Sequence, residues 1–201
     1  MPKPKDFIFR RNLNIDTAKE VHYILENVLD DADYFEIINP EDMHLSLVHQ
    51  GMLINRKIPR KFNPGYPNFE SNRSTFLKGQ KDSFPWATAE VGYLGTEMLK
   101  YTMAIKTDTP EWLKKERTKI LRISGIAKKD LNFDVNSYRP HISVANFVGA
   151  IRDLKYVEEV ELELHKHFKD IGEMVLDPLK LKSDLDNWDF RPLPFDIYTD
   201  F

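Results

Sequence analysis

Hydrophobic and polar positions along the chain follow two periods, one typical of half-buried strands and one typical of amphipathic helices. The helical period predicts helices from Asp16 to about Asp31, from Thr109 to a stop at Gly125, and over 153–171. Asp16 and Thr109 are the expected capping residues, because their side-chain oxygens can accept from free backbone N–H groups. The two-residue period predicts strands over 6–13, 34–38, 44–53, 87–94, 100–107, 138–147 and 175–182.

The order of these elements divides the chain into two similar halves. It runs strand, helix, strands and then strands, helix, strands. This order predicts the α+β class, with helices outside antiparallel sheets. We therefore expect residues 1–201 to form a single domain of two lobes.

The segment 55–86 interrupts the pattern. It contains four of the twelve prolines and shows neither period, so we expect a loop insertion with little regular structure. Seven basic residues stand there against two acidic ones. The insertion is either a lid that stacks bases and offsets phosphate charge, or a surface loop whose aromatic side chains pack onto the fold. Its aromatic residues are Phe62, Tyr66, Phe69, Phe76 and Trp86.

Composition narrows the class of protein. The chain has 41% hydrophobic and 30% charged residues, as in ordinary globular proteins, and the apolar run 7–9 is too short for a signal peptide or a membrane span. We therefore expect a cytoplasmic protein with no membrane partner. The absence of cysteine excludes disulfides, cysteine-ligated zinc and a thiol nucleophile. A net charge of −3 argues against binding to long duplex nucleic acid.

One short sequence motif, His-x-Ser between apolar residues, occurs twice in the chain, as Met-His-Leu-Ser-Leu over 43–47 and Pro-His-Ile-Ser-Val over 140–144. Successive side chains of a strand face opposite sides, so His44 and Ser46 share one face, and His141 and Ser143 do the same. If the two lobes pack with these faces together, two imidazoles and two hydroxyls meet in one cleft.

The remaining histidines do not fit such a site. His49 has the opposite parity to His44 on its expected strand, so it should face away from the cleft. His165 and His167 are two apart on a helix and do not share a face, which argues against a zinc pair. His22 lies beside the apolar stripe of the first helix and is expected to be structural. We therefore expect no metal site.

The residues before each motif make the pattern more specific. Pro40 and Glu41 precede His44, and Tyr138 and Pro140 precede His141. The chain thereby resembles the two-histidine (2H) phosphoesterase superfamily, the LigT-like and cyclic phosphodiesterase enzymes. The resemblance implies a pseudo-symmetric fold whose antiparallel sheets line a central cleft, with one motif per lobe. Both hydroxyl positions hold serine where threonine is commoner, and Asn146 replaces a frequent basic residue.

The resemblance implies a metal-independent phosphodiesterase that needs no cofactor and uses His44, Ser46, His141 and Ser143 as catalytic residues. One imidazole would take a proton from water or a ribose hydroxyl and the other would protonate the leaving oxygen, with the two assignments left open. The serines would donate hydrogen bonds to the phosphate oxygens. Auxiliary substrate contacts are expected from Tyr138, Arg139 and Trp86, with packing as the alternative.

The implied substrate is a ribonucleotide phosphodiester next to a 2′-hydroxyl. The candidates are an RNA end with a 2′,3′-cyclic phosphate, an oligonucleotide with 2′–5′ or 3′–5′ linkages, and a cyclic oligonucleotide signal of the kind that phage members of the superfamily degrade. An alternative from another class is a catalytically silent RNA- or nucleotide-binding sensor module of the same fold. RNA ligation is a third and weaker option.

Overall fold

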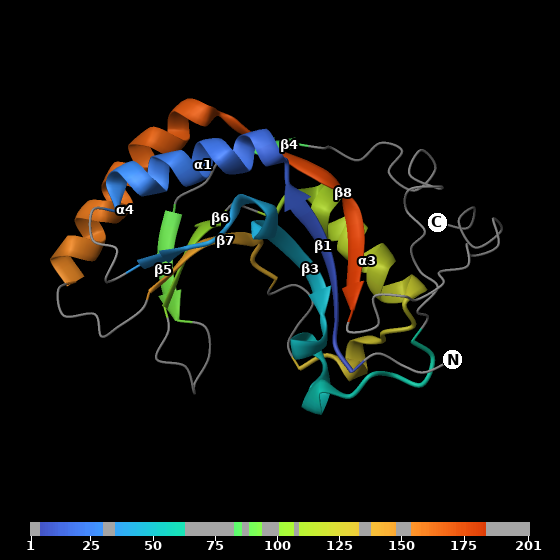
Figure 1. Cartoon of the computed structure of the whole chain (residues 1–201). Coiled ribbons are helices and arrows are strands. Elements are labelled where there is room, and N and C mark those ends of the chain that lie inside the picture. The colour runs from blue at the N-terminus through green and yellow to red at the C-terminus, as the bar shows by residue number, and fades with distance from the viewer. Residues whose placement is uncertain are drawn as a thin grey trace.

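The computed structural model describes residues 5–29, 35–62, 83–85, 89–93, 101–106, 109–132, 138–147 and 154–183. Its strands form one antiparallel sheet in the order β4-β8-β1-β3-β7-β6-β5, and β2 pairs with β7 off this path (Figure 1). The strands are β1 Phe7–Leu13, β2 Phe35–Ile37, β3 His44–His49, β4 Ser83–Pro85, β5 Ala89–Tyr93, β6 Tyr101–Lys106, β7 His141–Phe147 and β8 Glu173–Ser183. The helices are α1 Ile15–Val28, α3 Glu111–Ile123 and α4 Leu154–Ile171.

The expected α+β class is confirmed, and the two halves share one sheet. β3 and β7 are the central strands, and Leu45 of β3 pairs with Ile142 of β7. Helix α3 lies behind β1 and β8 and contacts β3, whereas α1 lies beside α4 at the other half of the sheet (Figure 1). Each half of the sheet is therefore covered by helix.

Strand β1 shows the alternation that positions the site. Phe7, Phe9 and Leu13 are buried, and the alternate residues Ile8, Arg10 and Asn12 are only partly buried. Arg11 shares the buried face and is fully enclosed. Its charge has buried partners, since its Nε donates to the Asp177 carbonyl at 2.8 Å and its guanidinium lies 3.8 Å from the Glu116 carboxylate of α3. The adjacent Arg10 consequently points to the other face of the sheet.

The helix boundaries differ from expectation at their starts. Asn14, not Asp16, caps α1, since its side-chain oxygen accepts from the Asp16 N–H at 3.1 Å. Thr109 does not cap α3, because its hydroxyl donates instead to the Tyr138 carbonyl at 3.1 Å. Gly125 ends α3 as expected, with φ +71° and a backbone hydrogen bond from the following Ile126 N–H to the Leu121 carbonyl.

The strand expected before the insertion is shorter in the structure, and only parts of the insertion are described. The strand expected over 44–53 ends at His49 and continues as a turn of 3-10 helix, Gln50–Met52. The described ends of the insertion are structured, since Ile54–Arg56 forms another such turn and β4 pairs with β8. Phe62 is buried against Phe7 with ring centroids 4.6 Å apart, so it is not available to stack on a base. Residues 63–82 and Trp86 lie outside the described residues.

Within the described part of the chain, none of the helices has the length and apolar character needed to cross a membrane.

Candidate active site

The two His-x-Ser motifs lie on the central strands with the expected facing. On β3, His44 and Ser46 are partly exposed and the residues between and after them, Leu45 and Leu47, are buried. On β7, His141 and Ser143 are partly exposed, whereas Ile142 and Val144 are buried. We call the side of the sheet that carries the four polar residues the motif face.

The pairing of Leu45 with Ile142 relates the two motifs. In an antiparallel ladder, the residues on either side of this pair are His44 with Ser143 and Ser46 with His141. By this register His44 stands across from Ser143 and Ser46 across from His141, and the two motifs are related by an approximate two-fold axis through the central pair.

Both imidazoles are oriented in the same way by the main chain. Nδ1 of His44 lies 2.6 Å from the Asp42 carbonyl oxygen, and Nδ1 of His141 lies 3.1 Å from the Arg139 carbonyl oxygen. A carbonyl can only accept, so Nδ1 of each ring carries the hydrogen. In the neutral ring Nε2 then holds the lone pair, and Nε2 is the atom left for chemistry on both histidines.

The surroundings of His44 favour its neutral form. Burial lowers the pKa of His44, and the nearby cations Arg10 and Lys182 lower it further. The hydrogen bond to the Asp42 carbonyl and the charge of Asp42 act in the opposite direction without reversing the result. His44 is therefore suited to accept a proton at neutral pH.

Two residues of β1 that sequence analysis missed lie on the motif face. Arg10 pairs with Ser46, and Asn12 pairs with His44. Arg10 Nε and Asn12 Oδ1 are buried and have no hydrogen-bond partner among the described residues. The alternation of Phe7, Phe9 and Leu13 could have placed both residues on this face, by the same parity that placed His44 and Ser46.

Further cations surround these residues on the motif face. Lys106 of β6 pairs with His141, and Lys180 of β8 pairs with Arg10. Directly opposed residues of an antiparallel pair share a face, so both lysines project on the same side as the motifs. The arrangement places positive charge around four groups that can carry protons and donate hydrogen bonds.

The expectation that His49 faces away is wrong. Phe9 pairs with Val48 but the next residue, Arg10, pairs with Ser46, so Leu47 is an extra residue in β3. This bulge reverses the alternation beyond it. His49 pairs with Ile8 and is partly exposed, and it returns to the motif face.

The three expected auxiliary residues lie in different surroundings. The Tyr138 hydroxyl donates to the Ser46 carbonyl at 2.7 Å, and the Arg117 guanidinium lies 4.4 Å from its ring centroid. Burial raises the pKa of Tyr138, which keeps the hydroxyl protonated. Arg139 is exposed, and its carbonyl orients His141. Trp86 lies outside the described residues. Contact of these three residues with substrate stays a prediction.

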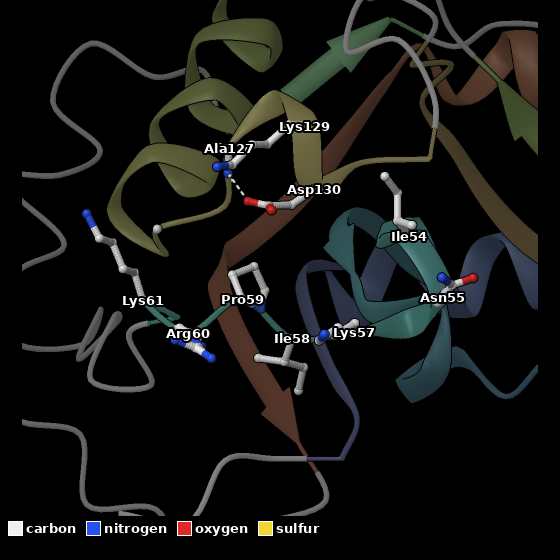
Figure 2. Close-up of a pocket in the computed structure, with 11 residues that line it drawn as sticks. Ile54, Asn55, Lys57, Ile58, Pro59, Arg60, Lys61, Ala127, Lys129 and Asp130 are labelled. Atoms are coloured by element: carbon white, nitrogen blue, oxygen red, sulfur yellow. Dashed lines mark hydrogen bonds between the residues drawn. The ribbon is translucent and has the colours of Figure 1, made fainter.

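A basic cavity of about 550 Å³ opens near the end of β3, between 54–61 and 125–130 (Figure 2). Among the described residues, Asp130 is the one carboxylate that lines it, and it accepts a hydrogen bond from the Ala127 N–H at 2.8 Å. None of the motif residues lines it. Its cations are Lys57, Arg60, Lys61 and Lys129.

Among the described residues, no group of three or more His, Asp or Glu side chains is arranged to hold a metal ion.

Comparisons with known proteins give a likeness of fold. No family model and no curated protein matches the sequence. Among solved structures, the chain is similar to ATU0111, a conserved protein of unknown function from Agrobacterium tumefaciens str. C58, at 12% identity and a TM-score of 0.52 over 90% of this chain and 80% of that one. It also matches Usb1 of Kluyveromyces marxianus at 13% identity over 90% of this chain and 96% of that one, but with a TM-score of 0.34, below the level that indicates a shared fold.

Proposed function

We propose that the chain is a 2H-type phosphodiesterase that acts on ribonucleotide phosphodiesters without a metal ion. One observation carries the proposal: two imidazoles, each with its Nδ1 bonded to a main-chain carbonyl, lie on one face of the sheet on either side of the Leu45–Ile142 pair. Binding alone does not need two proton carriers in matched positions. Acid and base catalysis at a phosphate does.

His44 is the general base in this proposal and His141 the general acid. The lowered pKa of His44 leaves its Nε2 lone pair free at neutral pH, whereas His141 Nε2 would carry the proton that the leaving group needs. His44 takes a proton from water or a ribose hydroxyl as the new O–P bond forms. The opposite P–O bond breaks, and His141 gives its proton to the departing oxygen.

The remaining groups of the motif face would stabilise the charge that builds on the phosphate. Ser46 and Ser143 donate hydrogen bonds to the non-bridging oxygens, and Arg10, beside Ser46, supplies a positive charge. In the family a basic residue often follows the second motif, where this chain has Asn146. That side chain accepts from the Thr102 hydroxyl at 3.4 Å, and Arg10 takes over the role of the cation.

The substrate class in this proposal is an RNA end, a short oligonucleotide or a cyclic nucleotide. Lys106, Lys180 and Lys182 supplement Arg10 on the motif face, which favours a ligand with more than one negative charge. The basic cavity near the end of β3 carries further positive charge.

The test is a panel of 2′,3′-cyclic nucleotides, 2′–5′ and 3′–5′ oligoadenylates and cyclic di- and trinucleotides, with products identified. We expect turnover of at least one class, insensitive to a chelator. His44→Ala and His141→Ala should each lower kcat by about 10²–10⁴. His165→Ala, an exposed histidine of α4, is the matched control. Full activity in either motif variant, or tight binding with no product from any substrate, would overturn the proposal, and the latter result would favour the sensor module.

A further inference from the structure

The bulge in β3 is held by two residues from outside the strand. Arg117 Nε of α3 donates to the Leu47 carbonyl at 3.0 Å, and the Tyr138 hydroxyl donates to the preceding Ser46 carbonyl at 2.7 Å. Arg117 and Tyr138 also stack on each other at 4.4 Å. Both carbonyls at the bulge therefore have buried partners, and the reversed alternation that brings His49 to the motif face is a fixed feature of the fold.

The ring of His49 is fixed in the opposite sense to the two motif histidines. Its Nδ1 accepts a hydrogen bond from the Gly51 backbone N–H at 3.1 Å. In the neutral ring the hydrogen must then sit on Nε2, which makes that atom a donor. His44 and His141 instead carry the hydrogen on Nδ1. His49 is thus built to donate, not to accept, a hydrogen bond on the motif face.

The surroundings of His49 keep it neutral. Burial lowers its pKa most, the charges of His141, Arg117 and His44 lower it further, and Asp6 alone raises it. A ring that stays neutral does not compete with the motif histidines as an acid.

We propose that His49 is a substrate-binding residue whose Nε2–H donates to a phosphate one step beyond the scissile one. The partners of His49 and Ser46 on β1, Ile8 and Arg10, are two residues apart, about 7 Å along the strand. That separation suits a second phosphate. This inference rests on the proposed phosphodiesterase function and specifies its substrate as an oligonucleotide that extends past the cleaved bond.

Lys182 supplies a cation for the same phosphate. Ile8 pairs with His49 on one side and with Lys182 on the other, so the three lie in one row across the motif face. The ammonium group of Lys182 lowers the pKa of His44, so its charge acts on the first motif histidine. A neutral donor and a cation on either side of Ile8 form a subsite suited to a phosphate monoanion.

Gly51 allows a test that removes no side chain from the motif face. A Cβ at Gly51 would lie 2.9 Å from Nδ1 and Cε1 of His49, so Gly51→Ala must displace the ring. His49→Ala removes the donor altogether, and His49→Gln restores an N–H donor on a side chain of similar length. His165→Ala on α4 is the matched control.

The substrates are a dinucleotide with and without an added terminal phosphate, at each end in turn. With the added phosphate at the end that His49 binds, we expect His49→Ala and Gly51→Ala to raise KM about tenfold, with kcat within about twofold. His49→Gln should recover part of this loss. The dinucleotide without that phosphate should be cleaved equally by all variants. An equal loss on both substrates, or no loss on either, would overturn the inference.

A measurement of binding distinguishes failure of the His49 subsite from failure of the proposed reaction. The Kd of the same oligonucleotides is measured by calorimetry in the His141→Ala background, where turnover does not interfere. If the wild-type protein cleaves no substrate but His49→Ala weakens binding of the longer ligand, the proposed reaction fails and the subsite stands. If the wild-type protein cleaves the oligonucleotides and Kd does not depend on His49, the subsite fails and the reaction stands. If neither cleavage nor binding is seen, both fail.

Discussion

The hydroxyl of Tyr138 donates a 2.7 Å hydrogen bond to the backbone carbonyl of Ser46, and so joins the residues leading into the second motif to the middle of the first. The two residues are 92 positions apart in sequence. Tyr138 also packs against Arg117, which holds the neighbouring carbonyl of Leu47. A residue expected to touch substrate thus has a structural role, which is to fix the strand that presents His44 and His49.

Removal of this hydroxyl should weaken both the fold and the reaction. In Tyr138→Phe the ring stays in place, but the Ser46 carbonyl loses its buried donor, which costs about 1–3 kcal/mol of unfolding free energy. Because that carbonyl flanks the bulge, kcat should fall as well. Urea unfolding and steady-state kinetics measure the two effects. Tyr23→Phe, on an exposed side chain of α1, is the control and should change neither.

The pH dependence of the reaction should reflect the cations around His44. The base must be neutral, so kcat/KM rises with pH through the pKa of His44, which burial, Arg10 and Lys182 hold below its ordinary value of 6.5. Arg10→Met removes a cation, raises this pKa and should move the acid limb to higher pH. Arg10→Lys keeps the charge and should leave the limb in place, as should Lys169→Met on α4. A limb that does not move in Arg10→Met would contradict the assignment of His44 as the base.

The alternation of the sequence was sufficient to predict which face of the sheet carries the four motif residues, but it gave the wrong face for His49. His44, Ser46, His141 and Ser143 lie on one face as the alternation predicts, because their short segments are regular strands. The bulge at Leu47 depends on Arg117 and Tyr138, which are distant in sequence. No local pattern around His49 reports such partners, so its return to the motif face could not be predicted.

Neighbouring polar residues show which features the alternation predicts and which depend on distant partners. Arg10 and Arg11 are adjacent and chemically identical, yet one lies on the motif face and the other is fully buried beside Glu116. Parity with Phe7 and Phe9 assigns them correctly, but a buried arginine is an unusual expectation without knowledge of its partner. Thr109 is a further case. The local sequence pattern assigns its hydroxyl to a helix cap, but the hydroxyl donates to the Tyr138 carbonyl, 29 residues away.

The basic cavity should contribute to binding of longer single strands. The double substitution Lys57→Glu and Arg60→Glu reverses the charge of two of the four cations that line it among the described residues. We expect weaker binding of RNA oligomers and a shallower dependence of log K on log salt, by about 0.7 for each phosphate that the protein no longer neutralises. Lys155→Glu on α4, an exposed position outside the cavity, is the control for charge. An equal effect in the control would show that net charge, not the cavity, governs binding.

Two glycines with left-handed backbones allow a matched test of packing. Gly125 has φ +71° and Gly172 has φ +78°, so alanine is strained at both, by about 1–2 kcal/mol. The room around them differs, because a Cβ at Gly125 would lie 2.5 Å from the Lys61 carbonyl oxygen, whereas one at Gly172 would meet nothing within 4 Å. Gly125→Ala must therefore also push 57–61 away from the end of α3. We expect its loss of unfolding free energy, measured by urea denaturation, to exceed that of Gly172→Ala by about 1–3 kcal/mol. Equal losses would show that the chain around Lys61 moves aside without cost, and that its packing against Gly125 does not stabilise the fold.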